Sequence, residues 1–311
     1  MRAPQRGIAL ILVLWVITLL TVMALGLTAV QRTETELTRN GLETVRFRAL
    51  SEAALNYTAL TLVVPPPNVD LDVGLGADPD AVVWMPDGAP HEWQFGGEPL
   101  TIRIFNEGSR VDLNQADADL LSRLFAVLGV EPDAAAALAD SIVDWRDEDD
   151  LHQLNGAEDG DYRQAGLPYG AKDERFTSVE ELQQVLGMDR ALYRRLAPLL
   201  TVAMDGADVE RTFAPAAILA ALDNTTIEDA EIELETRALE EGAGNLDRGG
   251  PLYRIQITRA VDSASSVGME ALIKIEPGPV LPFQVLWRRF GITPEAPQPQ
   301  LLEDDGEDLG W

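Results

Sequence analysis

An uncharged stretch close to the N-terminus limits this chain more than any other feature of its sequence. No charged residue occurs from Gly7 to Gln31, and residues 8–30 are almost all apolar. A helix of this length spans the roughly 30 Å hydrocarbon core of a bilayer. A secretory signal peptide would have a shorter apolar core, followed by a small-residue cleavage site. Because Arg2 and Arg6 precede the stretch, we predict a membrane-spanning helix over 8–30, with the bulk of the chain outside the cytoplasm.

The helical pattern continues beyond the apolar stretch. Small and apolar side chains recur every three or four residues from Leu37 to Leu60, which is typical of one face of a helix. The pattern stops at three consecutive prolines, Pro65 to Pro67, because proline cannot continue a helix. We therefore expect one N-terminal helix over 8–63, roughly 80 Å long at the usual rise per residue.

The composition excludes several classes of protein. The 311 residues include 52 Asp and Glu against 24 Lys and Arg, a net charge of -28. Non-specific nucleic-acid binding draws its affinity from cations on phosphates, so we expect no nucleic-acid partner. The chain has no cysteine and only two histidines, which removes disulfides, thiolate zinc sites and cysteine nucleophiles. It also lacks G-x-S-x-G, P-loop and H-E-x-x-H motifs, so we do not expect an enzyme.

The middle of the chain, residues 111–205, is predicted to be a separate helical block. Four helices are expected, beginning near capping residues: Asp112 or Asn114, Asp133, Thr177 or Ser178, and Asp189. The segments Leu128–Val130 and Leu186–Met188 have the Leu-Gly-apolar pattern of helix-hairpin-helix turns. Acidic residues follow both turns, which opposes binding of phosphates there.

Alternating apolar segments on both sides of this block predict strands: Ala81–Met85, Leu100–Phe105, Leu252–Val261, Met269–Ile275 and Pro282–Phe290. Glycine and proline turns separate them, as in an antiparallel meander. We therefore predict an α+β fold in which residues 64–110 and 206–290 form one antiparallel sheet domain and the all-α block is inserted. Residues 291–311 are rich in proline and then in acids, which predicts a disordered acidic tail.

The region with the most distinctive chemistry is an acidic loop within the helical block. Eight carboxylates lie between Asp144 and Asp161. A solvated acidic surface is one interpretation. The other is a cation site, because like charges repel and Ca²⁺ takes six to eight oxygen ligands with less geometric strictness than Mg²⁺. The spacing differs from that of an EF-hand. The candidate ligands are Asp147, Asp149, Glu158, Asp159 and Asp161.

The N-terminal segment resembles the leader of type IV pilins and pseudopilins. In that family a prepilin peptidase cuts after the glycine of a basic leader and methylates the new N-terminus. Arg6-Gly7 matches this pattern, so the resemblance implies a leader over 1–7 and a mature chain beginning at Ile8. Most members have Glu as the fifth mature residue, where this chain has Leu12. The absence of that Glu is a trait of the minor pseudopilin K family of type II secretion.

The motifs of the helical block resemble the same family. They are D-W-x-D-x-D at 144–149, N-G-A-E-D at 155–159, Pro168-Tyr169, and F-x-S-x-E-E-L at 176–182. The resemblance implies calcium binding in the acidic loop, with Asp173 standing where the family usually has Asn. The family's second helical portion is present only in degenerate form, between about 205 and 250.

The resemblance implies that the sheet domain is pilin-like and that the protein is a non-enzymatic minor pseudopilin. Such a protein would stand at the tip of a periplasmic pseudopilus. There it would help to initiate assembly and protein export across the outer membrane. The implied partners are minor pseudopilins I and J, the prepilin peptidase, and the inner membrane, which the chain would cross once with its C-terminal domain in the periplasm. Three alternatives stay open: a minor pilin of a type IV pilus, a membrane-anchored helix-hairpin-helix protein of DNA uptake, and a secreted enzyme that uses the acidic loop.

Overall fold

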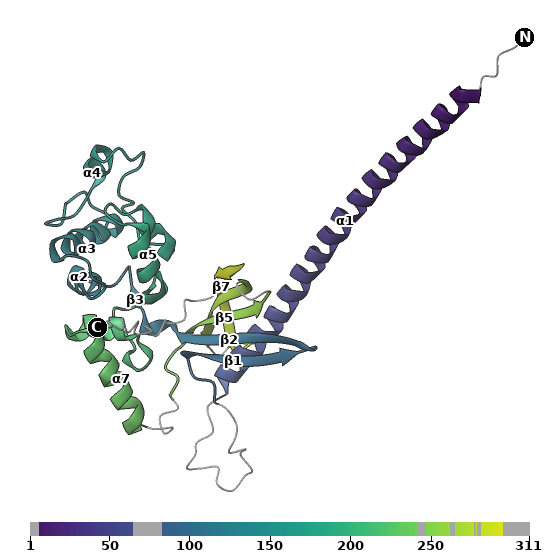
Figure 1. Cartoon of the computed structure of the whole chain (residues 1–311). Coiled ribbons are helices and arrows are strands. Elements are labelled where there is room, and N and C mark those ends of the chain that lie inside the picture. Colours follow the sequence, from purple (N-terminus) through teal and green to yellow (C-terminus); the bar gives the residue numbers. More distant parts are fainter. Residues whose placement is uncertain are drawn as a thin grey trace, which may run out of the picture. The chain divides into compact units, whose positions relative to one another are not determined.

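A computed structural model describes residues 6–64, 83–241, 247–261, 265–276, 278 and 281–294 (Figure 1). The chain divides into two compact units, Met1–Ala54 and Leu55–Trp311. The first unit consists of the greater part of one helix. The second contains the end of that helix, an antiparallel sheet and a helical domain. The α+β fold class expected from the sequence is confirmed.

The N-terminal helix is continuous, as predicted. α1 runs from Arg6 to Val63. Its segment Leu10–Leu27 has a mean hydropathy of 2.7 and is long and apolar enough to cross a membrane. Within that segment the hydroxyls of Thr18 and Thr21 donate to the carbonyls four residues earlier, at 2.8 Å each. These polar groups are therefore satisfied inside the helix, as a lipid environment requires.

A buried arginine closes the last turn of α1, within the second unit. The Arg248 guanidinium donates to the carbonyls of Thr61, Leu62 and Val64 at 2.9, 3.2 and 2.7 Å. Its Nε also donates to the Trp84 carbonyl at 3.0 Å. The last carbonyls of a helix have no partner within the helix, and a cation is favourable at that end. Arg248 thus fixes the end of α1 to the segment that leads into the sheet.

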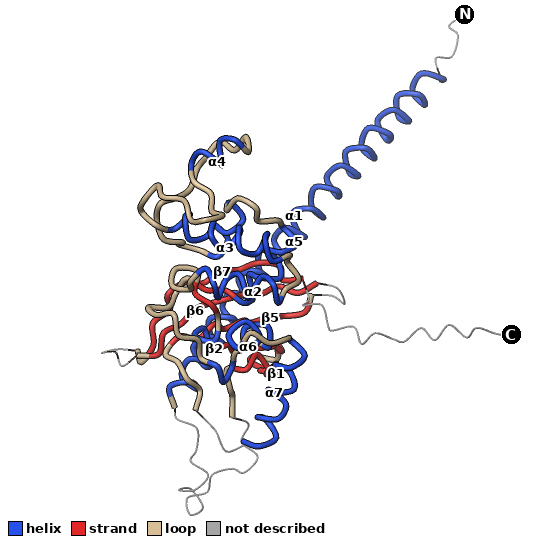
Figure 2. Tube along the Cα trace, turned by 90° about the vertical axis from the view of Figure 1, so that its left-hand side faces the viewer, coloured by secondary structure: helices blue, strands red, loops and turns tan. Residues whose placement is uncertain are grey.

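The sheet has five antiparallel strands in the order β1-β2-β5-β6-β7 (Figure 2). The strands are β1 Asp87–Phe95, β2 Glu98–Asn106, β5 Leu252–Ala260, β6 Ser265–Ile275 and β7 Phe283–Pro294. Gly96 and Gly97 both have positive φ, 60° and 84°, and form the turn that joins β1 to β2. Ile102, Ile255 and Ile257 are completely buried. These three isoleucines supply the core on one face of the central strands.

Two expectations about the strands need correction. Residues 83–85 are not a strand, and 81–82 lie outside the described residues; the first strand is β1 instead. β1 contains Pro90, which is compatible with an edge strand but weakens the sequence signal. β7 continues to Pro294, so the first four residues of the expected tail, 291–294, are paired in the sheet. Residues 295–311 lie outside the described residues.

The helical domain follows the expected pattern, with further helices after it. Its helices are α2 Ala118–Val127, α3 Pro132–Arg146, α4 Asp159–Gln164, α5 Arg190–Leu196, α6 Ala216–Asp223 and α7 Ile227–Glu241. Short 3₁₀ turns occur as well: η1 Glu107–Ser109, η2 Val179–Gln184, η3 Ala197–Leu199 and η4 Arg211–Phe213. The two-residue strands β3 (Val111–Asp112) and β4 (Leu200–Thr201) pair in parallel. This pairing brings the two ends of the inserted block together.

Four details of the block differ from expectation. α4 was not predicted, because its six residues begin within the acidic loop and have no apolar periodicity. The N-cap of α2 is Asp117, whose carboxylate accepts from the Leu120 amide at 2.8 Å, whereas Asp112 binds the Asn114 amide in the preceding turn. Residues 179–184 form a 3₁₀ helix rather than the expected α-helix. Residues 216–241, which we assigned to the sheet domain, form α6 and α7. These helices share the buried core of α2 and α3, so the helical packing continues past 205.

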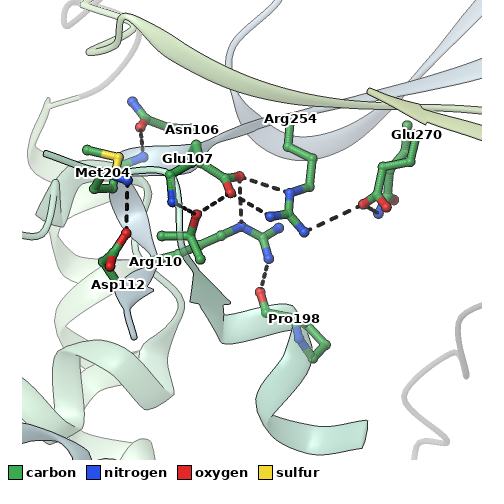
Figure 3. Close-up of polar contacts among 12 residues, drawn as sticks. Asn106, Glu107, Arg110, Asp112, Pro198, Met204, Arg254 and Glu270 are labelled. Atoms are coloured by element: carbon green, nitrogen blue, oxygen red, sulfur yellow. Dashed lines mark hydrogen bonds and ion pairs between the residues drawn. The ribbon is translucent and has the colours of Figure 1, made fainter. Parts of the chain in front are cut away.

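A buried ion network joins the sheet to the helical domain (Figure 3). Glu107 is fully buried and accepts from Arg254 of β5 through both carboxylate oxygens, at 2.9 and 2.5 Å. The Thr201 hydroxyl donates to the same carboxylate at 2.6 Å, and Arg110 lies 3.5 Å from it. Arg110 also donates to the Pro198 carbonyl. Because a buried charge is costly without partners, this network holds the two parts in one arrangement.

Candidate metal site

The acidic loop is anchored at its start by the end of α3. The Arg146 guanidinium donates to the carbonyls of Leu113 and Ala116, the latter at 2.6 Å. The loop then returns toward α3, because the Gln153 amide donates to Asp144 at 3.0 Å. The side chain of Asp144 is therefore enclosed by the loop that follows it.

Four carboxylates each present one buried oxygen without a hydrogen-bond partner in the described part of the chain. They belong to Asp144, Asp147, Glu158 and Asp173. Asp144 is fully buried and Glu158 is 3% exposed. A buried carboxylate oxygen without a partner carries a desolvation cost of several kcal/mol. Such oxygens in one loop require a compensating cation or proton.

Burial and mutual repulsion both act on the carboxylates of this site. Burial raises the pKa of Glu158 to about 7, with repulsion from Asp144, Asp173 and Asp147 adding to the effect. Burial likewise raises the pKa of Asp147, and Asp149, Asp144 and Asp173 repel its charge. A carboxylate whose pKa is raised by burial and by neighbouring negative charges is stabilised by a positive charge beside it.

The position of Asp173 has a backbone reason. Its φ of 56° lies in the left-handed region, which Asn and Asp tolerate better than most residues. Its amide donates to the Trp145 carbonyl at 3.1 Å, which brings the residue back to the end of α3. The family resemblance implies an Asn at this position, and both Asn and Asp tolerate the left-handed backbone conformation.

The other three predicted ligands have structural partners. Asp161 accepts from the Glu158 amide at 3.0 Å and contacts His152 at 2.7 Å, and these hydrogen bonds lower its pKa. Asp159 pairs with Arg163 at 3.3 Å. Asp149 accepts from the amide two residues later. The structure therefore brings together Asp147, Glu158 and Asp173, and it does not place Asp149, Asp159 and Asp161 among the unpaired oxygens.

Sequence reasoning missed Asp144 as a ligand candidate. It lies in the last turn of α3, three residues before Asp147, which is the C-cap of that helix. A Cβ on Gly156 would lie 1.8 Å from the unpaired Asp144 oxygen. Only glycine allows the loop to approach this carboxylate so closely. The start of the D-W-x-D-x-D run was the signal that could have identified it.

A hard cation fits this donor set. Ca²⁺ prefers carboxylate and carbonyl oxygens, and all four unpaired atoms are carboxylate oxygens. In the described residues no three carboxylate or imidazole groups are already arranged around one point as ligands. Binding an ion would therefore require these side chains to rearrange, with backbone carbonyls or water completing the shell.

The predicted leader junction, Gly7-Ile8, lies at the start of α1. Gly7 and Ile8 are in its first turn, and no break in the helix separates them. Leu12 follows four residues later and is 62% exposed. The aliphatic side chain at this depth carries no charge that could pair with an amine.

Residues 104–205 match the family model described as type II secretion system (T2SS), protein K. The relatives include the type II secretion system protein K of Aeromonas hydrophila, 30% identical over 301 residues, which covers 88% of this chain and 89% of the relative. The Pseudomonas aeruginosa protein K is 30% identical over 77% of this chain and 74% of its own length. The Pectobacterium carotovorum protein K is 29% identical, and the chain spans 63% of its length.

The fold has a solved counterpart. The crystal structure of the GspK-GspI-GspJ complex from the enterotoxigenic Escherichia coli type 2 secretion system contains a chain similar to this one, with a TM-score of 0.54 and 20% identity. The match covers 82% of this chain and 98% of that chain. The chain therefore belongs to the type II secretion system protein K family.

Proposed function

We propose that this protein is a minor pseudopilin of a type II secretion system that stands at the tip of the pseudopilus and helps to initiate its assembly. The observation that carries the proposal is the joining of a single apolar α1 to a sheet domain with an inserted helical block, in a chain of the protein K family. Its role is structural rather than catalytic. The buried polar groups of the junction network serve to fix one domain on the other.

The partners follow from the solved relative. That chain was crystallised with GspI and GspJ, and we propose that this protein binds the corresponding minor pseudopilins of its own system. Co-purification of the full chain from detergent extracts tests this. Both partners should be recovered in stoichiometric amounts. Recovery of type IV pilus subunits instead would support the minor-pilin alternative.

Processing and placement in the membrane complete the proposal. The prepilin peptidase would cut between Gly7 and Ile8 and methylate the new N-terminus. The mature chain would cross the inner membrane once through 8–30, with the sheet and helical domain in the periplasm. The arginines ahead of the apolar stretch and its exposed apolar side chains support this orientation.

The acidic loop would hold Ca²⁺ through Asp144, Asp147, Glu158 and Asp173. The support is the set of buried, unpaired oxygens and the mutual repulsion of these carboxylates. A bound cation would neutralise that repulsion and tie the loop to the end of α3 and to Asp173. Its role would be to stabilise the helical domain, without any part in a reaction.

The tip position follows from Leu12. In pilins the Glu at this place neutralises the N-terminal amine of a neighbouring subunit during assembly, whereas Leu12 provides no carboxylate. A subunit that lacks this Glu cannot neutralise the buried N-terminal amine of a neighbour. Such a subunit is suited to the end of the filament, where no further subunit lies above it. A helical domain inserted into the sheet domain adds bulk that would oppose addition on that side.

A further inference from the structure

We infer that a groove between the two hairpin turns of the helical domain is a docking site for an amphipathic helix that carries Lys or Arg on its flanks. The groove has a volume of about 550 Å³ and runs between Gly129 and Gly187. Its floor is a face of α3, and the segment 155–157 forms a third wall. The inference goes beyond the function proposed above, since neither calcium nor pseudopilins I and J enter it.

The floor of the groove suits a closely packed helix. Ala134, Ala137, Leu138 and Ser141 line it and follow the i, i+3, i+4, i+7 spacing of one helix face. The Ser141 hydroxyl donates to the Ala137 carbonyl at 2.8 Å, so its hydrogen is already used. The floor is therefore apolar in character. Its small side chains let the backbone of a second helix come near that of α3, because interaxial distance depends on the side chains between helices.

The ends of the groove do not suit a phosphate. Gly129 and Gly187 have φ of 81° and 89°, the left-handed turns expected of the hairpins. The Asp189 carboxylate accepts from the amides of Ala191 and Leu192 at 2.6 and 2.9 Å. A phosphate bound at the start of α5 would need these amides. The hairpin that leads into α5 therefore lacks the free donors that a nucleic-acid backbone requires.

The charge around the groove favours a cationic partner. Two carboxylates, Asp161 and Asp189, line it. Arg195 is the one cation among the described lining residues, and its guanidinium donates to the Leu128 carbonyl at 2.6 Å. Carboxylates thus outnumber cations at the rim. Lys or Arg on the flanks of a partner helix would complement them and orient the helix.

An exposed leucine extends the apolar surface at the third wall. Leu154 is 94% exposed and Leu151 is 73% exposed. Leu154 precedes Asn155, which lines the groove and donates to Asp140 of α3 through its backbone and side-chain nitrogens, at 2.9 and 3.1 Å. These bonds fix Asn155, the neighbour of Leu154 in the chain, on α3. Apolar side chains exposed beside a groove are typical of an interaction surface.

Binding of a model helix tests the inference. The full chain is placed in phosphatidylcholine nanodiscs in Ca²⁺-containing buffer. The probe is a peptide of two LKKLLKL heptads, with two LEELLEL heptads as the charge-reversed probe and empty nanodiscs as the reference. We expect the cationic peptide to bind and the acidic peptide not to bind. Leu154→Ser should weaken the binding about tenfold, because it removes one leucine side chain from the contact.

Two further variants separate the groove from the general acidity of the chain. Leu239→Ser removes a leucine of similar exposure, 85%, on α7 and should leave the affinity unchanged. Ala134→Arg puts bulk and positive charge on the groove floor and should weaken binding more than tenfold. No binding of the cationic peptide, or equal affinities for wild type, Leu154→Ser and Ala134→Arg, would overturn the inference.

Discussion

Buried acidic side chains dominate the chemistry of this protein at the scale of single residues. Asp144, Asp147, Glu158 and Asp173 each have one unpaired buried oxygen, whereas the fully buried Glu107 has partners on both oxygens. The two cases predict opposite responses to removal of charge. A carboxylate among like charges is relieved by neutralisation, and a carboxylate paired with arginines leaves them unpaired.

In the loop, the effect of removing charge on the free energy of unfolding should depend on the proposed Ca²⁺. Wild-type full-length protein should gain about 2.7 kcal/mol of unfolding free energy with Ca²⁺ at a hundred times its dissociation constant. Asp147→Asn with Glu158→Gln should lose most of that gain, yet be no less stable than wild type without Ca²⁺, because repulsion is relieved. Asp149→Asn with Asp159→Asn is the charge-matched control and should keep the gain. A melting temperature of the wild type that Ca²⁺ leaves unchanged would show that the loop is only a solvated acidic surface.

At the junction, Glu107→Gln should destabilise the full chain by about 3 kcal/mol, since it leaves buried arginines without their carboxylate. Arg254 keeps Glu270 at 3.7 Å, which is why the lower end of the usual range applies. Chemical denaturation monitored by circular dichroism measures the loss. Glu233→Gln breaks the exposed pair with Arg237 and should cost no more than about 0.5 kcal/mol. Equal losses in the two variants would contradict the assigned role of the network.

At the scale of elements, the proposed membrane insertion and processing depend on α1. Gly7 lies in its first turn, and a peptidase that cuts after Gly7 would have to approach the backbone there. Gly7→Val should therefore block cleavage, and the wild type should begin at a methylated Ile8 in intact-mass spectrometry. Gly26→Val, a matched change inside the apolar segment with open space around its Cβ position, should leave processing unchanged. Retention of Met1 in the wild type would contradict the pilin interpretation.

The sequence predicted the elements whose signals are local. The helix 8–63 and the strands β5 to β7 have clear periodicity and turn residues, and they form as expected. β1 was missed because glycine and proline interrupt its pattern, and the strand forms because β2 supplies its hydrogen bonds. α6 and α7 were missed because their apolar residues pack into the core that they share with α2 and α3, a contact that no local pattern records.

The candidate site was predicted in part for a similar reason. Composition and motif order located the acidic loop correctly but could not rank its carboxylates. Asp161 fits the acidic pattern as well as Glu158 does, yet the fold gives it a backbone amide and His152 as partners. In the sequence Asp144 has the pattern of an ordinary helix residue. Its burial results from the tertiary path of the loop, whose Gln153 amide donates to it. Which oxygens stay unpaired depends on the tertiary path of the chain.

At the scale of the whole molecule, the residue at position 12 bears on where the protein would lie in a filament. Leu12→Glu restores the carboxylate that other pilins have at this depth. An unpaired Glu in the bilayer costs about 3 kcal/mol or more, and at the tip no subunit above offers an amine to offset it. We expect secretion and recovery of partner pseudopilins to stay equal or fall, at matched protein level. Leu12→Gln controls for polarity without charge. Improved assembly with Leu12→Glu would mean that the protein lies inside the filament.

Locating the protein on assembled pseudopili is the direct test of its assignment to the tip. The chain has no cysteine, so Leu239→Cys on the exposed side of α7 provides a single attachment point for a maleimide–gold label. Pseudopili assembled with this variant, once it has been shown to support secretion, are then imaged by electron microscopy. The account predicts gold at one end of each filament and nowhere along its length. Label distributed along the filaments would contradict the assignment to the tip.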